Sequence, residues 1–207
     1  MSSFATARKL ALPSLVKNKQ LPNLEIKWGN VLKTFENFVK DVKEPYSVVA
    51  NLPYQITSPV IRMFLECSHP PTDLVLMVQK EVAERICAEP GDMSVLAIAS
   101  QYYAECKYLF TVPRTSFWPS PRVDSAVIWL KRHEKLGLSS EQEKRLFVLA
   151  KQGFSSKRKK LFNNLLPVIG KNNREKLTGV FADLGLNDLS RAQELSLAEW
   201  VELAKLF

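Results

Sequence analysis

The stretch with the most distinct chemistry is Asn51-Leu52-Pro53-Tyr54, which follows the apolar run at residues 47–50. This short run is rich in β-branched residues and precedes a proline, which predicts a buried parallel strand. In open α/β sheets, ligands bind outside the carboxyl ends of strands. The Asn51 side chain offers an acceptor, Pro53 fixes the backbone so that a neighbouring carbonyl can be a second acceptor, and Tyr54 offers a stacking ring. Two acceptors aimed at an exocyclic amine leave its lone pair facing an electrophile, so the tetrad favours N-alkylation of a flat base.

The same tetrad also fits an ordinary exit from a strand into a loop. In that interpretation the asparagine tolerates an unusual backbone dihedral and the proline ends the strand. A single tetrapeptide does not separate the two alternatives. The choice depends on other parts of the chain.

Composition limits the classes of protein that this chain can represent. The chain has 207 residues, of which 46% are hydrophobic and 24% are charged, as in ordinary globular proteins. It has no apolar run long enough for a membrane span and no hydrophobic segment of a signal peptide in its first twenty residues, which predicts a cytoplasmic protein. The three cysteines and two histidines lack metal-ligand spacing, so we expect reduced, packed thiols and no metal site. The net charge of +8 favours a polyanionic partner.

Strand-like and helix-like patterns alternate in the first part of the chain, which predicts an α/β fold with a parallel, doubly wound sheet. The predicted strands are 24–28, 47–50 and 74–78, and the predicted helices are 31–39, 80–88 and a helix from Thr57 or Ser58 with Pro59 at its first position. A helix from Ser94 to Tyr103 and two strands, 108–112 and 125–130, follow. The loop between these strands is too apolar at its centre for a simple linker.

The polar stretch 131–139 predicts a domain boundary, after which only helices are expected, at 140–152, 157–166, 173–182 and 196–206. The basic run Lys157, Arg158, Lys159 and Lys160 lies in this region. Such a run is usually a solvated helix face. Four consecutive charges would surround a helix, however, and a phosphate backbone would relieve their repulsion, which predicts contact with nucleic acid.

Several separated motifs resemble one family, the ribosomal RNA adenine N6,N6-dimethyltransferases of the bacterial KsgA type. The resembling segments are 51–54, 79–82, 117–125, Phe154 with 157–160, and 191–196, within a resemblance that runs from about Pro22 to the C-terminus. Because the motifs occur in the family's order, the resemblance is more specific than the tetrad alone.

The resemblance implies an enzyme that uses S-adenosyl-L-methionine to place two methyl groups on N6 of each of two adjacent adenosines near the 3′ end of small-subunit ribosomal RNA. Asn51 and the backbone at Leu52 and Pro53 would then hold the amine of a flipped adenine. Tyr54 would stack on one face of the base and Phe117 would close the other.

The chain departs from the family pattern where the cofactor binds. Family members have a glycine-rich turn after their first strand, whereas no two of the seven glycines here are close enough to form one. Asn30 stands where the family usually has aspartate, and its amide, with that of Asn51, is the predicted cofactor contact. We therefore expect an N-terminally shortened chain with unpaired strand edges and weak cofactor binding.

The resemblance predicts an incomplete methyltransferase domain at 1–132, which lacks its first strand and glycine-rich turn, and a small helical RNA-binding domain at 133–207. The expected partner is small-subunit ribosomal RNA or the immature small subunit, bound by a monomer. One alternative is a non-catalytic RNA-binding factor of ribosome assembly. A relative that methylates large-subunit RNA is disfavoured by segments 117–125 and 191–196, and DNA adenine methyltransferases share the tetrad but not the tail.

Overall fold

The computed structural model describes residues 29–40 and 42–207. The strand predicted at 24–28 lies outside this part of the chain. Contacts divide the chain into two units between Thr34 and Phe35. The sheet and the helices after α2 belong to the second unit.

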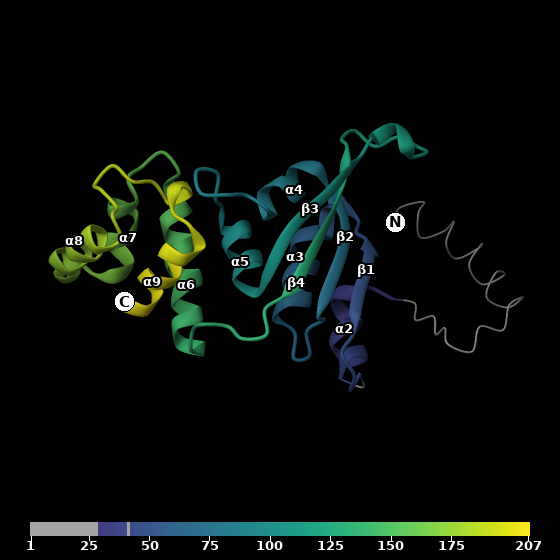
Figure 1. The fold of residues 1–207 in the computed structure, drawn as a ribbon, viewed down its shortest axis with the longest axis horizontal. Helices are drawn as coiled ribbons and strands as arrows, with labels where there is room; N and C mark the ends of the chain where they lie inside the picture. Colours follow the sequence, from purple (N-terminus) through teal and green to yellow (C-terminus); the bar gives the residue numbers. More distant parts are fainter. Residues whose placement is uncertain (1–28, 41) are drawn as a thin grey trace, which may run out of the picture. The chain divides into compact units, whose positions relative to one another are not determined.

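The described strands form one mixed sheet with the order β1-β2-β4-β3 (Figure 1). Their bounds are β1 Ser47–Asn51, β2 Asp73–Gln79, β3 Ala104–Val112 and β4 Ser125–Arg132. β1 and β2 are parallel, but β4 is antiparallel to both β2 and β3. The predicted α/β fold with a C-terminal helical region is confirmed, and the expected parallel pairing holds for β1 and β2. It does not extend to β3 and β4, because these strands follow each other through a loop without a crossover helix.

The burial of β1 also differs from the prediction. Val49 in the middle of this strand is 81% exposed, whereas Leu74, Leu76 and Val78 of β2 are fully buried. The physical reason is position, since among the described strands β1 pairs only with β2 and forms the edge of the sheet. A run of β-branched residues indicates that a strand forms, but it does not indicate whether neighbouring elements bury that strand.

Helices α2 Val31–Val39, α3 Thr57–Glu66, α4 Lys80–Ile86 and α5 Val95–Tyr103 accompany the sheet, and α4 packs against β2 and β4. The predicted start of α5 at Ser94 is confirmed, and Ser94 is its N-cap, because Ser94 Oγ accepts the amide hydrogen of Ala97 at 3.1 Å. The predicted start of α3 is wrong. The short 3-10 turn Tyr54–Ile56 leads directly into α3, so Ile56 is the N-cap and Pro59 is the third helical residue.

The last part of the described chain is helical, as predicted, with α6 Ser140–Gly153, α7 Leu161–Ile169, α8 Arg174–Asp183 and α9 Leu197–Leu206 (Figure 1). The side chain of Asn164 donates to the carbonyls of Gly153 at 2.7 Å and Ser156 at 3.1 Å. These bonds fix the turn before α7, so α7 starts at Leu161 and not at residue 157.

Contacts of α5 join the sheet to the terminal helices. The Tyr103 hydroxyl donates to Glu143 Oε1 at 2.5 Å, and the Tyr103 ring stacks on Phe147 of α6 at a centroid distance of 5.9 Å. The domain boundary expected between residues 132 and 133 stays a prediction.

Candidate active site

Three segments that are far apart in the sequence meet at one edge of the sheet. β1 and β2 end there and β4 begins there, with Asn51 opposite Met77 and Gln79 opposite Ser125. The amide of Lys80 donates to the Asp124 carbonyl at 3.0 Å. The motifs at 51–54, 79–82 and 117–125 therefore converge on the carboxyl ends of two parallel strands, which is where open α/β sheets bind ligands.

The tetrad presents two hydrogen-bond acceptors at this edge. The Pro53 carbonyl already accepts from the Ile56 amide at 3.1 Å and from Thr57 Oγ1 at 3.3 Å. Within the described part of the chain, no group donates to the Leu52 carbonyl or pairs with the exposed side-chain amide of Asn51. The acceptors available to an external amine are therefore the Asn51 side chain and the Leu52 backbone.

The Tyr54 ring is held by a residue to which the sequence alone assigned no role. The Tyr54 hydroxyl and Ser125 Oγ form a hydrogen bond of 2.8 Å, and Ser125 is 1% exposed. In the sequence, Ser125 is the last residue of the motif 117–125 and a small hydroxyl residue at the start of an apolar strand. Its partner becomes evident only when β4 is placed beside β2.

Phe117 lies on the loop that connects β3 and β4, directly after the 3-10 turn Arg114–Ser116. The Asp124 carboxylate accepts from the Arg114 amide at 2.8 Å, and Ser120 Oγ donates to the Arg114 carbonyl at 2.9 Å. These bonds close the loop on itself. Among the described aromatic pairs no ring contact joins Phe117 to Tyr54, so the role of Phe117 on the second face of a base stays a prediction.

Asn30 precedes α2 in the first unit of the chain. Its side-chain oxygen accepts the amide hydrogen of Leu32 at 3.0 Å and thereby caps the helix. Part of its acceptor capacity is therefore used inside the protein. Its contact with a cofactor stays a prediction.

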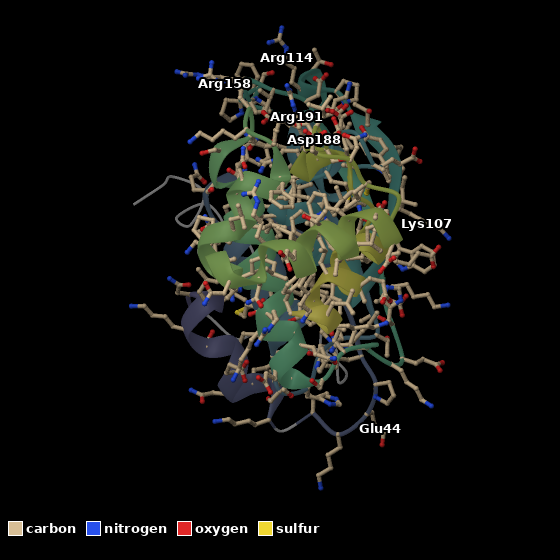
Figure 2. All side chains as sticks on the ribbon, turned by 90° about the vertical axis from the view of Figure 1, so that its left-hand side faces the viewer. Glu44, Lys107, Arg114, Arg158, Asp188 and Arg191 are labelled. Carbon is tan, nitrogen blue, oxygen red and sulfur yellow. The ribbon has the colours of Figure 1, made fainter. Side chains whose placement is uncertain are left out.

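The basic run occupies a turn and does not surround a helix, because α7 starts only at Leu161. Lys157, Arg158 and Lys159 are exposed, whereas Lys160 is half-buried and pairs with Asp188 at 3.1 Å. In the view of Figure 2, Arg158, Arg191 and Arg114 all lie toward the top.

The cysteines are not poised for chemistry. Burial raises the pKa of Cys106 to about 12 and that of Cys87 to about 11, and burial also raises the pKa of Cys67. Their thiols are therefore protonated at neutral pH. In residues 29–40 and 42–207 no group of three or more His, Cys, Asp or Glu side chains could hold a metal ion. No helix in the same ranges is long and apolar enough to cross a membrane.

Comparisons with known proteins identify the family and the fold. A family model described as "Ribosomal RNA adenine dimethylase" matches residues 8–207. Ribosomal RNA small subunit methyltransferase A of Streptococcus pneumoniae strain D39 is 40% identical over 191 residues, which cover 90% of this chain and 66% of that relative. The enzyme of strain R6 matches with the same values. The chain therefore spans slightly less than two thirds of the length of these curated relatives.

Two solved structures resemble the fold. The structure of a dimethyladenosine transferase from Plasmodium falciparum superposes with a TM-score of 0.76 at 25% identity, over 93% of this chain and 75% of that chain. The 23S rRNA methyltransferase ErmE has a TM-score of 0.74 at 23% identity, over 96% of this chain and 78% of its own. The second match supports the architecture alone.

Proposed function

Because this chain belongs to the ribosomal RNA adenine dimethylase family, we propose that it methylates N6 of two adjacent adenosines near the 3′ end of small-subunit ribosomal RNA. The observation that carries the proposal is the pair of acceptors at Asn51 and Leu52, beside the ring of Tyr54. These groups match the two hydrogens and the flat face of adenine. We also propose that residues 1–132 form the methyltransferase domain and residues 133–207 the RNA-binding domain.

The residues at the sheet edge would orient the amine. N6 of adenine is a poor nucleophile because its lone pair is delocalised into the ring. Acceptance of its two hydrogens by the Asn51 side chain and the Leu52 carbonyl would draw the amine toward a pyramidal geometry. Once the adenine has flipped out of the RNA stack, Tyr54, held by Ser125, would stack on one face of the base and Phe117 would approach the other face.

The methyl donor of this family is S-adenosyl-L-methionine, whose sulfonium makes its methyl group electrophilic. Asn51 lies where it could contact both the donor and the base, and Asn30 is the second proposed contact. The described residues fit the base side of the site better than the donor side, because the Asn30 oxygen is already a helix cap and the sequence has no glycine-rich turn.

The proposed partner is the RNA of the immature small ribosomal subunit, in the cytoplasm. The exposed basic turn supports this, since its positive charges suit a phosphate backbone. We propose action as a monomer, because Asn51, Tyr54 and Ser125 come from one chain. The same basic turn favours a second candidate, a non-catalytic RNA-binding factor of ribosome assembly.

The test is transfer of labelled methyl groups from S-adenosylmethionine to undermethylated small subunits. We expect transfer by the chain and a loss of roughly 100-fold in Asn51→Ala, similar to the removal of one preorganised hydrogen-bonding group in other enzymes. Asn172→Ala is the matched control, because Asn172 is also exposed but lies in the helical region. Subunit binding without any transfer would overturn the enzymatic proposal in favour of the assembly factor.

A further inference from the structure

A second candidate site lies in the helical region, between α7 and α8. A cleft of about 430 Å³ opens there, within the size range of ligand sites in proteins. Residues that line it include Lys160, Phe162, Arg174, Phe181 and Asp188. These residues are aromatic or charged, and none of them belongs to the sheet edge that carries the tetrad.

The floor of the cleft is a fixed stacking surface. Phe162 meets the buried Phe181 edge to face, with ring centroids 5.3 Å apart and an interplanar angle of 80°. The Arg174 guanidinium lies over the Phe162 ring, 5.2 Å from its centroid. Phe162 is only half-buried and Arg174 is exposed, so the packed surface is reachable from solvent. Aromatic rings and guanidinium planes are the groups on which proteins stack unpaired bases.

The charges around the cleft suit a phosphate chain. Lys160 lines the cleft and is the last residue of the basic run, so Lys157, Arg158 and Lys159 directly precede it. Asp188, which also lines the cleft, pairs with Lys160 at 3.1 Å and offsets its charge, so the net positive charge beside the cleft comes from residues 157–159 and from Arg174. Figure 2 shows Arg158 and Asp188 toward the same end of the molecule. A polyanion on the basic turn would therefore continue into the cleft.

We propose that this cleft binds one unpaired nucleotide of the RNA. Its base stacks on the Phe162–Arg174 surface, and its phosphates face Lys160 and the basic turn. The inference rests on the proposed function for the identity of the ligand as RNA, but it assigns a site separate from the one that holds the target adenine. A base inside a duplex has both faces covered, so the cleft selects single-stranded segments.

The experiment measures binding of a fluorescein-labelled single-stranded RNA decamer to the full chain at several salt concentrations. We expect Phe162→Leu to weaken binding by about 5- to 50-fold with an unchanged salt slope, because it removes stacking and no charge. Arg174→Gln is expected to weaken binding by a similar factor, because it removes the guanidinium plane that forms the other part of the stacking surface.

Arg62→Gln is the matched control, because it removes the same charge from an exposed position of α3, outside the helical region, whose side chain pairs with Glu66. It should leave the affinity and the salt slope unchanged. Since Phe162 also packs on Phe181, thermal unfolding of Phe162→Leu is recorded beside binding. Arg174 is exposed, so its variant tests the cleft even if Phe162→Leu fails to fold.

The proposal that the cleft binds an unpaired nucleotide is contradicted if Arg174→Gln binds the decamer as the wild type does. It is also contradicted if a duplex of the same sequence competes as well as the single strand. Methyl transfer to small subunits is measured with the same wild-type preparation. If methyl transfer occurs and the variants bind the decamer as the wild type does, the nucleotide site is contradicted and the proposed function is supported. If the variants bind the decamer more weakly but the wild type transfers no methyl group, the proposed function is contradicted and the nucleotide site is supported.

Discussion

Among the described residues, Tyr54 and Ser125 form the one side-chain hydrogen bond that joins the tetrad to β4, at 2.8 Å. Tyr54→Phe leaves the hydroxyl of Ser125, which is 1% exposed, without this partner, and a buried unpaired hydroxyl costs about 1–3 kcal/mol of unfolding free energy. We expect Ser125→Ala to cost less, because the half-buried Tyr54 hydroxyl can reach water. Urea unfolding of both single variants and the double variant measures these costs.

The double variant removes both hydroxyls and leaves none unpaired. Its loss of stability should therefore be smaller than the sum of the two single losses. Strictly additive losses would show that the hydrogen bond contributes nothing to stability.

At the same scale, the sequence predicted the position of the tetrad but not its partners. The order of residue types from Asn51 to Tyr54 is local and can be recognised without a structure. The bond to Ser125 depends on the register between β2 and β4, which no local pattern records. Likewise, only the hydrogen bonds to the Pro53 carbonyl show that the free backbone acceptor is at Leu52.

Among the elements, the junction of α6, α7 and α9 requires a glycine. A Cβ at Gly153 would lie 2.5 Å from Trp200 Cη2 and 2.9 Å from Leu161 Cδ1. Because Trp200 is fully buried, it has no room to move away. We expect Gly153→Ala to lower the unfolding free energy by about 1–3 kcal/mol, as overpacked cores do.

Gly179→Ala is the matched control for this prediction. Gly179 lies inside α8 and a Cβ there would meet nothing within 4 Å. Alanine is a better helix former than glycine, so this variant should gain about 0.5–1 kcal/mol. Chemical denaturation of both variants would contradict the argument if they shifted in the same direction.

The contact between α5 and α6 predicts a dependence of stability on alkaline pH. Burial, followed by the nearby Glu143 carboxylate, raises the pKa of Tyr102 to about 12, above the value near 10 of an unfolded tyrosine. The folded state thus holds this proton more tightly, so the stabilisation is complete below pH 10 and is lost as the pH rises toward 12. Thermal unfolding between pH 8 and 12 should show a smaller decrease in Tyr102→Phe than in the wild type. Parallel curves would exclude the contribution of Tyr102.

The starts of helices that follow a serine were predicted to within a residue or two, since a serine at the start of a helix is a local signal. The structure confirms the start at Ser94 and places the cap of α6 at Ser139, where the side chain accepts from the Gln142 amide. Strand direction was not predictable in this way, because alternation of apolar residues is the same in parallel and antiparallel strands. The start of α7 was missed because the side chain of Asn164 fixes the preceding turn from eight residues away.

At the scale of the whole molecule, the arrangement predicts weak binding of the methyl donor by this 207-residue chain. The Asn30 oxygen is engaged by Leu32, and the sequence supplies no glycine-rich turn for the amino-acid part of the donor. We expect isothermal titration with S-adenosylmethionine to give no micromolar binding. A micromolar dissociation constant would show that other residues hold the donor.

The open flank of β1 has a consequence for the behaviour of the chain in concentrated solution. Within residues 29–40 and 42–207 no strand pairs with the second side of β1, so its backbone groups beside the exposed Val49 are a template onto which a strand of another molecule can add. Such addition is self-propagating, so purification would be limited by precipitation at high concentration well before unfolding. A lysine in place of Val49 would act as a gatekeeper against this assembly.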